Sequence, residues 1–126
     1  MKIFHKDSCI TCKKTISQLD RMKVDLEKRD FFKEPFSESE LKKILKLAGK
    51  KPSEMIRKRD KMFKELNFEQ KNYSESKIIK FMIKYPGLIQ RPIIISKNKV
   101  HIGKIDPKKI QDYSSFSLRN IRTASR

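Results

Sequence analysis

The chain has 126 residues, which is enough for one domain with one core and too short for two. No apolar run approaches the roughly 18 residues of a membrane span, and residues 1–5 lack the apolar region and cleavage site of a signal peptide, so we expect a soluble, cytoplasmic protein. The formal net charge of +17 favours anionic partners such as nucleic acid or acidic proteins, although a solvated, lysine-rich surface gives the same composition.

The opening segment predicts a parallel β-α-β unit. Residues 2–5 lean apolar and favour a short strand. From Cys12 onward the spacing becomes helical, because three apolar residues fall on one face: Ile16, Leu19 and Met22. Residues 24–31 alternate at their start, as a half-buried strand does. A strand, a helix and a strand in this order form a parallel unit.

Residues 36–89 are predicted to form a mainly helical block. Ser37 is a good N-cap, and Glu40 stands three residues later, where it completes a capping box. Two further helices are predicted in this block, a short one over residues 52–56 and a longer one capped by Ser74.

The last part of the chain predicts a hairpin and a helix. Residues 91–95 read as a buried strand, and residues 100–102 return as a second strand after a tight turn. A final helix is predicted over residues 106–113, and the basic tail over residues 114–126 is expected to be frayed or disordered. Residues 1–113 are therefore expected to form a single α/β domain of thioredoxin-like order, with a four-stranded mixed sheet and a helical insertion.

Both cysteines lie in one C-x-x-C motif where the first strand gives way to the first helix. A thiolate at Cys9 would face unpaired backbone N–H groups and the positive end of the helix dipole, with Lys13 and Lys14 adding positive charge. These effects predict a lowered pKa for Cys9, which would make it a nucleophile toward disulfides, peroxides or oxyanions. Cys12 could then attack the adduct and close a disulfide.

Other roles for the cysteines are less favoured. A zinc site would need two further ligands, and only His5 and His101 could supply them. We therefore expect neither a bound metal nor another cofactor. His5 is expected to pack or cap near the cysteine turn, and a role in tuning Cys9 is the alternative.

Four stretches carry a family resemblance: residues 9–14, 33–37, 56–59 and 85–95. On these residues the chain resembles the arsenate reductase family and its relatives, the Spx-type redox regulators, over residues 1–113. The resemblance implies a cis-proline at Pro92, beside the C-x-x-C turn.

For an enzyme, the resemblance implies that Cys9 is the nucleophile and that Arg57 and Arg91 hold the oxyanion, since forked guanidinium groups suit such a ligand. The third cationic position of these reductases falls near Lys104, which keeps the charge but lacks the fork. Cys12 would resolve the intermediate, and thioredoxin, glutaredoxin or glutathione would supply electrons to a monomeric protein. We favour this thiol-dependent reductase of arsenate or a related thiol or disulfide substrate.

The alternative is a redox-sensing transcription regulator. Spx-type regulators use the C-x-x-C pair as a disulfide switch, and an arginine that maps to Arg59 helps them to bind the α subunit of RNA polymerase. Lys51 stands where they carry a glycine that matters for this contact, which weakens the match, while the net charge and basic tail keep RNA polymerase or nucleic acid as possible partners. A general thiol–disulfide oxidoreductase is a third reading. Arg57 and Arg59 could also be no more than part of a solvated basic face.

Overall fold

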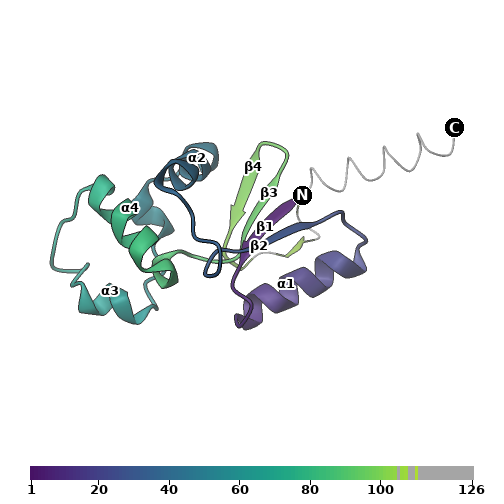
Figure 1. Cartoon of the computed structure of the whole chain (residues 1–126), viewed down its shortest axis with the longest axis horizontal. Coiled ribbons are helices and arrows are strands. Elements are labelled where there is room, and N and C mark those ends of the chain that lie inside the picture. The colour runs from purple at the N-terminus through teal and green to yellow at the C-terminus, as the bar shows by residue number, and fades with distance from the viewer. Residues whose placement is uncertain (105, 108–109, 111–126) are drawn as a thin grey trace, which may run out of the picture.

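The computed structural model describes residues 1–104, 106–107 and 110, and its centre is a four-stranded sheet (Figure 1). In spatial order its strands are β2 (Glu27–Asp30), β1 (Lys2–His5), β3 (Ile93–Ser96) and β4 (Lys99–Ile102). β1 runs parallel to β2 and antiparallel to β3, and β3 and β4 form an antiparallel hairpin. The mixed sheet predicted from the sequence is therefore confirmed.

Both faces of the sheet are covered, because successive residues of a strand point to opposite sides. Ile3 of β1 belongs to a small core that also contains Leu19 of α1 (Ile10–Arg21). Its neighbour Phe4 belongs to a larger core, which β1 shares with the helical block. Figure 1 shows the strands between α1 and the remaining helices.

The β1-α1-β2 unit is confirmed with shifted boundaries. α1 begins at Ile10, so Cys12, from which the helical spacing was read, lies in the first turn and Cys9 is the N-cap residue of the helix. β2 occupies only the second half of the strand predicted over residues 24–31. Lys23 has a φ of 58°, in the left-handed region, and turns the chain before it can enter the sheet.

The helical block between β2 and β3 is also confirmed. It contains α2 (Glu38–Ala48), the 3-10 helix η1 (Pro52–Met55), α3 (Lys61–Glu65), α4 (Glu75–Lys84) and the 3-10 helix η2 (Pro86–Leu88). The predicted capping box opens α2: the Glu40 N–H donates to Ser37 Oγ at 3.1 Å, and the Ser37 N–H donates to Glu40 Oε1 at 3.0 Å. The short helix predicted over residues 52–56 stops one residue early, because Ile56 enters a β-bridge with Ile89.

The sequence does not predict α3. Its apolar residues, Met62 and Phe63, are only partly buried against the core, and with five residues the helix is too short to show a clear period. The signal is instead local, because the Asp60 side chain caps the helix by accepting the Met62 N–H at 3.0 Å.

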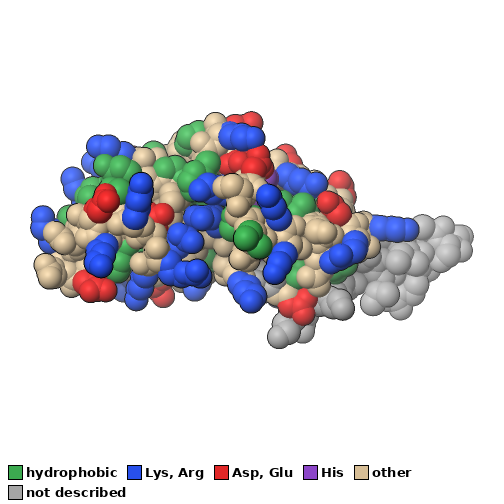
Figure 2. Space-filling model, turned by 90° about the horizontal axis from the view of Figure 1, so that it is seen from below, with side chains coloured by type: hydrophobic (Ala, Val, Ile, Leu, Met, Phe, Trp, Pro, Cys, Tyr) green, Lys and Arg blue, Asp and Glu red, His purple; other side chains and the backbone are tan. Residues whose placement is uncertain are grey.

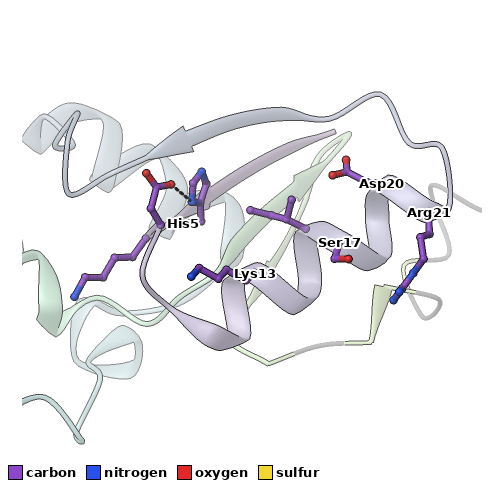
Figure 3. A pocket seen from close by; sticks show the side chains of 8 residues that line it. His5, Lys13, Ser17, Asp20 and Arg21 are labelled. Carbon is purple, nitrogen blue, oxygen red and sulfur yellow. Dashed lines mark ion pairs between the residues drawn. The ribbon is translucent and has the colours of Figure 1, made fainter.

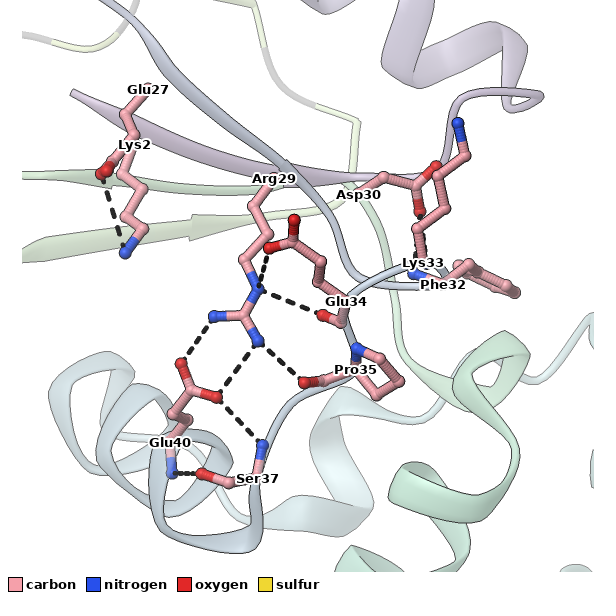
Figure 4. A network of polar contacts seen from close by, with 10 residues as sticks. All are labelled: Lys2, Glu27, Arg29, Asp30, Phe32, Lys33, Glu34, Pro35, Ser37 and Glu40. Atoms are coloured by element: carbon pink, nitrogen blue, oxygen red, sulfur yellow. Dashed lines mark hydrogen bonds and ion pairs between the residues drawn. The ribbon is translucent and has the colours of Figure 1, made fainter.

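A network centred on Arg29 joins β2 to the start of α2 (Figure 4). Its Nη1 donates to Glu40 Oε2 at 2.6 Å, and its Nη2 donates to Glu40 Oε1 and to the carbonyl of Pro35. Its Nε donates to the carbonyl of Glu34 at 3.1 Å. The Arg29 guanidinium, helped by the backbone N–H of Ser37, lowers the pKa of Glu40 to about 2.

The predicted hairpin is confirmed, although β3 begins at Ile93 rather than Arg91. Pro92 has no N–H to offer the ladder, so it stands just outside the strand. The helix predicted over residues 106–113 and the tail over residues 114–126 lie almost wholly outside the described residues. In the part of the chain that is described, no helix has the length and apolar character needed to cross a membrane.

Candidate functional site

The C-x-x-C motif occupies the turn from β1 into α1. Cys9 is the N-cap residue, and its Sγ accepts the backbone N–H of Cys12 at 3.4 Å. Both thiols are free; Cys12 is buried, whereas Cys9 is partly exposed beside Ile10, which is 69% exposed. An incoming reagent can therefore approach Cys9 before it can approach Cys12.

The two thiols differ in acidity. Burial raises the pKa of Cys9, but hydrogen bonds from the backbone and thiol of Cys12, together with the hydrogen bonding and charge of Arg91, outweigh it and leave that pKa below its usual value. Burial, together with the hydrogen bond and charge of neighbouring Cys9, raises the pKa of Cys12 to about 12, and the backbone of Lys6 and the charge of Arg91 oppose this only in part. Cys9 is thus the more acidic thiol of the pair and Cys12 the less acidic one.

Arg91 supplies cationic donors beside Cys9. It precedes Pro92 through a cis peptide bond, which is the geometry that the resemblance implies. Its Cζ lies 5.5 Å from the centre of the Phe32 ring. Its Nε and Nη1 are enclosed and have no hydrogen-bond partner among the residues that the structure describes. Buried donors of this kind normally find an acceptor, and two donors of a guanidinium fork suit an oxyanion.

Arg57 belongs to the same cluster of charges. Burial lowers its pKa first and the charge of Arg91 lowers it next, while Cys9 opposes this, so each group lies within electrostatic reach of the others. Its Nη1 lies 3.7 Å from Asp60 Oδ1. We refer to Cys9, Arg57 and Arg91 together as the anion site.

Sequence reasoning missed two residues that position Arg57. Asp60 uses one carboxylate oxygen to cap α3 and the other to face the guanidinium. A Cβ on Gly87 would collide with that carboxylate, so only glycine leaves room for it. The available signal was the Asp-capped turn that directly follows the Arg57–Arg59 run.

The other two predicted cations, Arg59 and Lys104, are both exposed, and neither is a main cause of the lowered pKa of Cys9. Arg59 is exposed, and it influences Arg57 only through its charge. Lys104 is exposed in the bend after β4. The remaining positive charge is dispersed: Figure 2 shows Lys and Arg side chains over the whole visible face rather than in one patch.

A pocket of about 450 Å³ lies along α1 beside the cysteine turn (Figure 3). It is lined by His5, Lys6, Asp7, Lys13, Ile16, Ser17, Asp20 and Arg21. His5 is buried, with Nδ1 3.4 Å from Asp7 Oδ1. His101 lies on β4, beyond β3, so the two histidines stand on different strands of the sheet.

Comparisons with known proteins agree with this geometry. The global transcriptional regulator Spx of Bacillus subtilis is 29% identical over 124 residues, covering 93% of this chain and 92% of its own length. Spx of Streptococcus pneumoniae strain R6 is 32% identical over 101 residues, which cover 80% of this chain and 76% of the length of that protein. The solved arsenate reductase from Vibrio cholerae superposes with a TM-score of 0.78 at 23% identity, covering 89% of this chain and 97% of that one. The model of the ArsC family matches residues 4–112, and the chain therefore belongs to the ArsC family.

Proposed function

We propose that the protein is a thiol-dependent reductase of arsenate or of a related oxyanion. The observation that carries the proposal is the pair of unused, enclosed donors on Arg91 next to the low-pKa thiol of Cys9. Arg91 and Arg57 would hold the oxyanion while the Cys9 thiolate attacks its central atom. Oxygen would leave as water, with a bond between Cys9 Sγ and arsenic in its place.

The second step would use Cys12. Its thiolate would attack Cys9 Sγ, forming the Cys9–Cys12 disulfide and breaking the sulfur–arsenic bond. The electron pair of that bond would stay on arsenic, which reduces As(V) to As(III) while the two thiols are oxidised. Thioredoxin, glutaredoxin or glutathione would then supply two electrons to reopen the disulfide.

The acidity of Cys12 would order these steps. Its pKa of about 12 keeps it protonated while Cys9 is a thiolate, because burial and the neighbouring negative charge both disfavour a second thiolate. Once Cys9 Sγ is bonded to arsenic, the thiolate charge beside Cys12 is replaced by charge on the oxygens of the adduct, which Arg57 and Arg91 would neutralise, so Cys12 would lose its proton more easily. The resolving thiol would therefore become more reactive once the adduct has formed.

The direct test is arsenate-dependent consumption of NADPH by the full chain with a thioredoxin or glutaredoxin system. We expect turnover by the wild-type chain and none with Cys9→Ser. We expect Cys12→Ser to stall after the first turnover in the thioredoxin system and to recover when glutathione is added. Wild-type turnover no greater than that of Cys9→Ser would exclude the proposal.

A second candidate function is that of a redox-switched regulator, which the similarity to proteins named global transcriptional regulators favours. Here the Cys9–Cys12 disulfide would change the affinity for the C-terminal domain of the RNA polymerase α subunit, with Arg59 in the contact. Pull-down of that domain by the oxidised and the reduced chain tests this function. Equal and weak retention in both states would exclude it.

A further inference from the structure

A second group of potential ligands lies at the end of β1 and β2, apart from the two thiols. His5 ends β1 and is paired in register with Asp30, which ends β2. Asp7 follows two residues later, on the loop that leads to Cys9. One ligand atom from each of the three residues lies within 4.8 Å of the others.

His5 points to a ligand independently of the two carboxylates. Its side chain is only 9% exposed, and its Nδ1 is enclosed with no hydrogen-bond partner among the residues described here. This nitrogen lies 3.4 Å from Asp7 Oδ1. The dashed line at His5 in Figure 3 marks an ion pair of this residue. A buried imidazole nitrogen normally has a partner, so a nitrogen that faces carboxylates without a hydrogen bond presents a metal-binding donor set.

Asp30 is held as a preformed ligand. Its Oδ2 accepts the Asp7 N–H at 3.0 Å, and its Oδ1 accepts the N–H groups of Phe32 at 2.8 Å and Lys33 at 3.3 Å. Oδ1 uses both of its lone pairs in these bonds, whereas Oδ2 retains one for a metal ion, and the backbone bonds fix the direction in which the carboxylate points.

Lys33 already neutralises part of the negative charge of the His5, Asp7 and Asp30 group. Its Nζ donates to Asp7 Oδ2, which leaves Asp7 Oδ1 on the His5 side. A metal ion bound between His5 and Asp7 would therefore compete with Lys33 for the charge of one carboxylate.

We propose that His5, Asp7 and Asp30 form a binding site for a divalent transition-metal ion of the Zn²⁺ class. One imidazole nitrogen and two carboxylate oxygens suit Zn²⁺ better than Mg²⁺, which prefers an all-oxygen shell. The adjoining pocket, which His5 and Asp7 line, gives the ion an entry path and room for water as a further ligand.

The test is calorimetric titration of the full chain with Zn²⁺, and separately with Mg²⁺. The chain carries Cys9→Ser and Cys12→Ser, so that thiolates cannot contribute. We expect one Zn²⁺ site that Mg²⁺ does not fill. His5→Gln and Asp7→Asn should each weaken Zn²⁺ binding about tenfold or more, since each removes one ligand.

Two further variants separate this site from general attraction to surface carboxylates. Lys33→Met should tighten Zn²⁺ binding, because it removes the competing cation. Asp20→Asn changes an acid that lines the same pocket outside the ligand group, and it should leave Zn²⁺ binding unchanged. Absence of Zn²⁺ binding, or binding that His5→Gln and Asp7→Asn leave unchanged or Lys33→Met weakens, would overturn the proposal.

Discussion

Arg29 and Arg91 lie in two regions of the molecule. Each guanidinium lies near a phenylalanine ring, but the two differ in the hydrogen bonds that they make. The Cζ of Arg29 lies 5.3 Å from the centre of the Phe36 ring, and that of Arg91 lies 5.5 Å from the centre of the Phe32 ring. Arg29 directs its donors to a carboxylate and two backbone carbonyls. Arg91 keeps two enclosed donors without a partner in the described part of the chain. The first guanidinium joins elements of the fold, whereas the second keeps buried donors that, in the function proposed above, would receive an anion.

Removing Arg91 should give the largest effect on activity. We expect Arg91→Met to lower kcat/KM for arsenate about 100-fold or more, because it removes a charged, preorganised donor pair. It should also raise the pKa of Cys9, since Arg91 helps to lower that pKa. NADPH-coupled kinetics and the pH dependence of Cys9 alkylation measure the two effects.

The control for this variant is its thermal stability. A fall in Tm as large as that of the matched Arg29→Met variant would mean that Arg91 is structural, and the contrast between the two arginines would be lost.

Removing Arg29 should give the largest effect on stability. We expect Arg29→Met to reduce the free energy of unfolding by about 2 kcal/mol, because it leaves Glu40 without its charged partner and the carbonyls of Glu34 and Pro35 without a donor. Urea unfolding measures this change. The pKa of Cys9 should stay as it is in the wild-type chain, and a shift of that pKa would show that the two regions are not independent.

Gly87→Ala should produce an intermediate effect on the anion site. The new Cβ would push the Asp60 carboxylate away and release Arg57 from its orienting partner. We expect KM for the oxyanion to rise about fivefold, near 1 kcal/mol, with little change in kcat. Asp60→Asn keeps the size of the side chain and should reproduce part of the rise. An unchanged KM in both variants would remove Asp60 from the positioning of Arg57.

The smallest effect concerns acid stability. The folded pKa of Glu40, about 2, is below its ordinary value of 4.5, so its pairing with Arg29 stabilises the fold above pH 4.5. That stabilisation is lost as the pH falls from about 4.5 towards 2. We expect about 1 kcal/mol from this group, because the side chain is partly exposed and solvent screens the pair. Unfolding at pH 6 and pH 3 should therefore differ less for Glu40→Gln than for the wild-type chain, and an equal difference would contradict the pairing.

Local sequence signals predicted much of the fold. Ser37 and Glu40 marked the start of α2 because a capping box involves only neighbouring residues. The alternation and spacing of apolar residues predicted the β-α-β unit and the hairpin. α3 was missed because it is only five residues long and its apolar residues are only partly buried. The helical spacing of α1 was read from Cys12 onward, because Ile10 and Thr11 before it are not buried.

Only some residues of the candidate site could be predicted from the sequence. The thiols were evident from their spacing, and Arg57 and Arg91 came from the family resemblance. Asp60 is only three residues from Arg57, so its capping turn was a usable local signal, whereas the role of Gly87 depends on a contact with Asp60 between segments far apart in the chain. The meeting of His5 with Asp7 and Asp30 likewise depends on the register between β1 and β2.

The most direct measurement is protection of Cys9 from alkylation by a non-reducible oxyanion. Iodoacetamide is applied to the Cys12→Ser chain with increasing inorganic phosphate at constant ionic strength. We predict that phosphate slows alkylation of Cys9 in a saturable way and that this protection disappears with Arg91→Met but persists with Arg29→Met. Alkylation that is indifferent to phosphate, or protected equally in the Arg91→Met chain, would contradict an anion site built from Arg91 and the Cys9 thiolate.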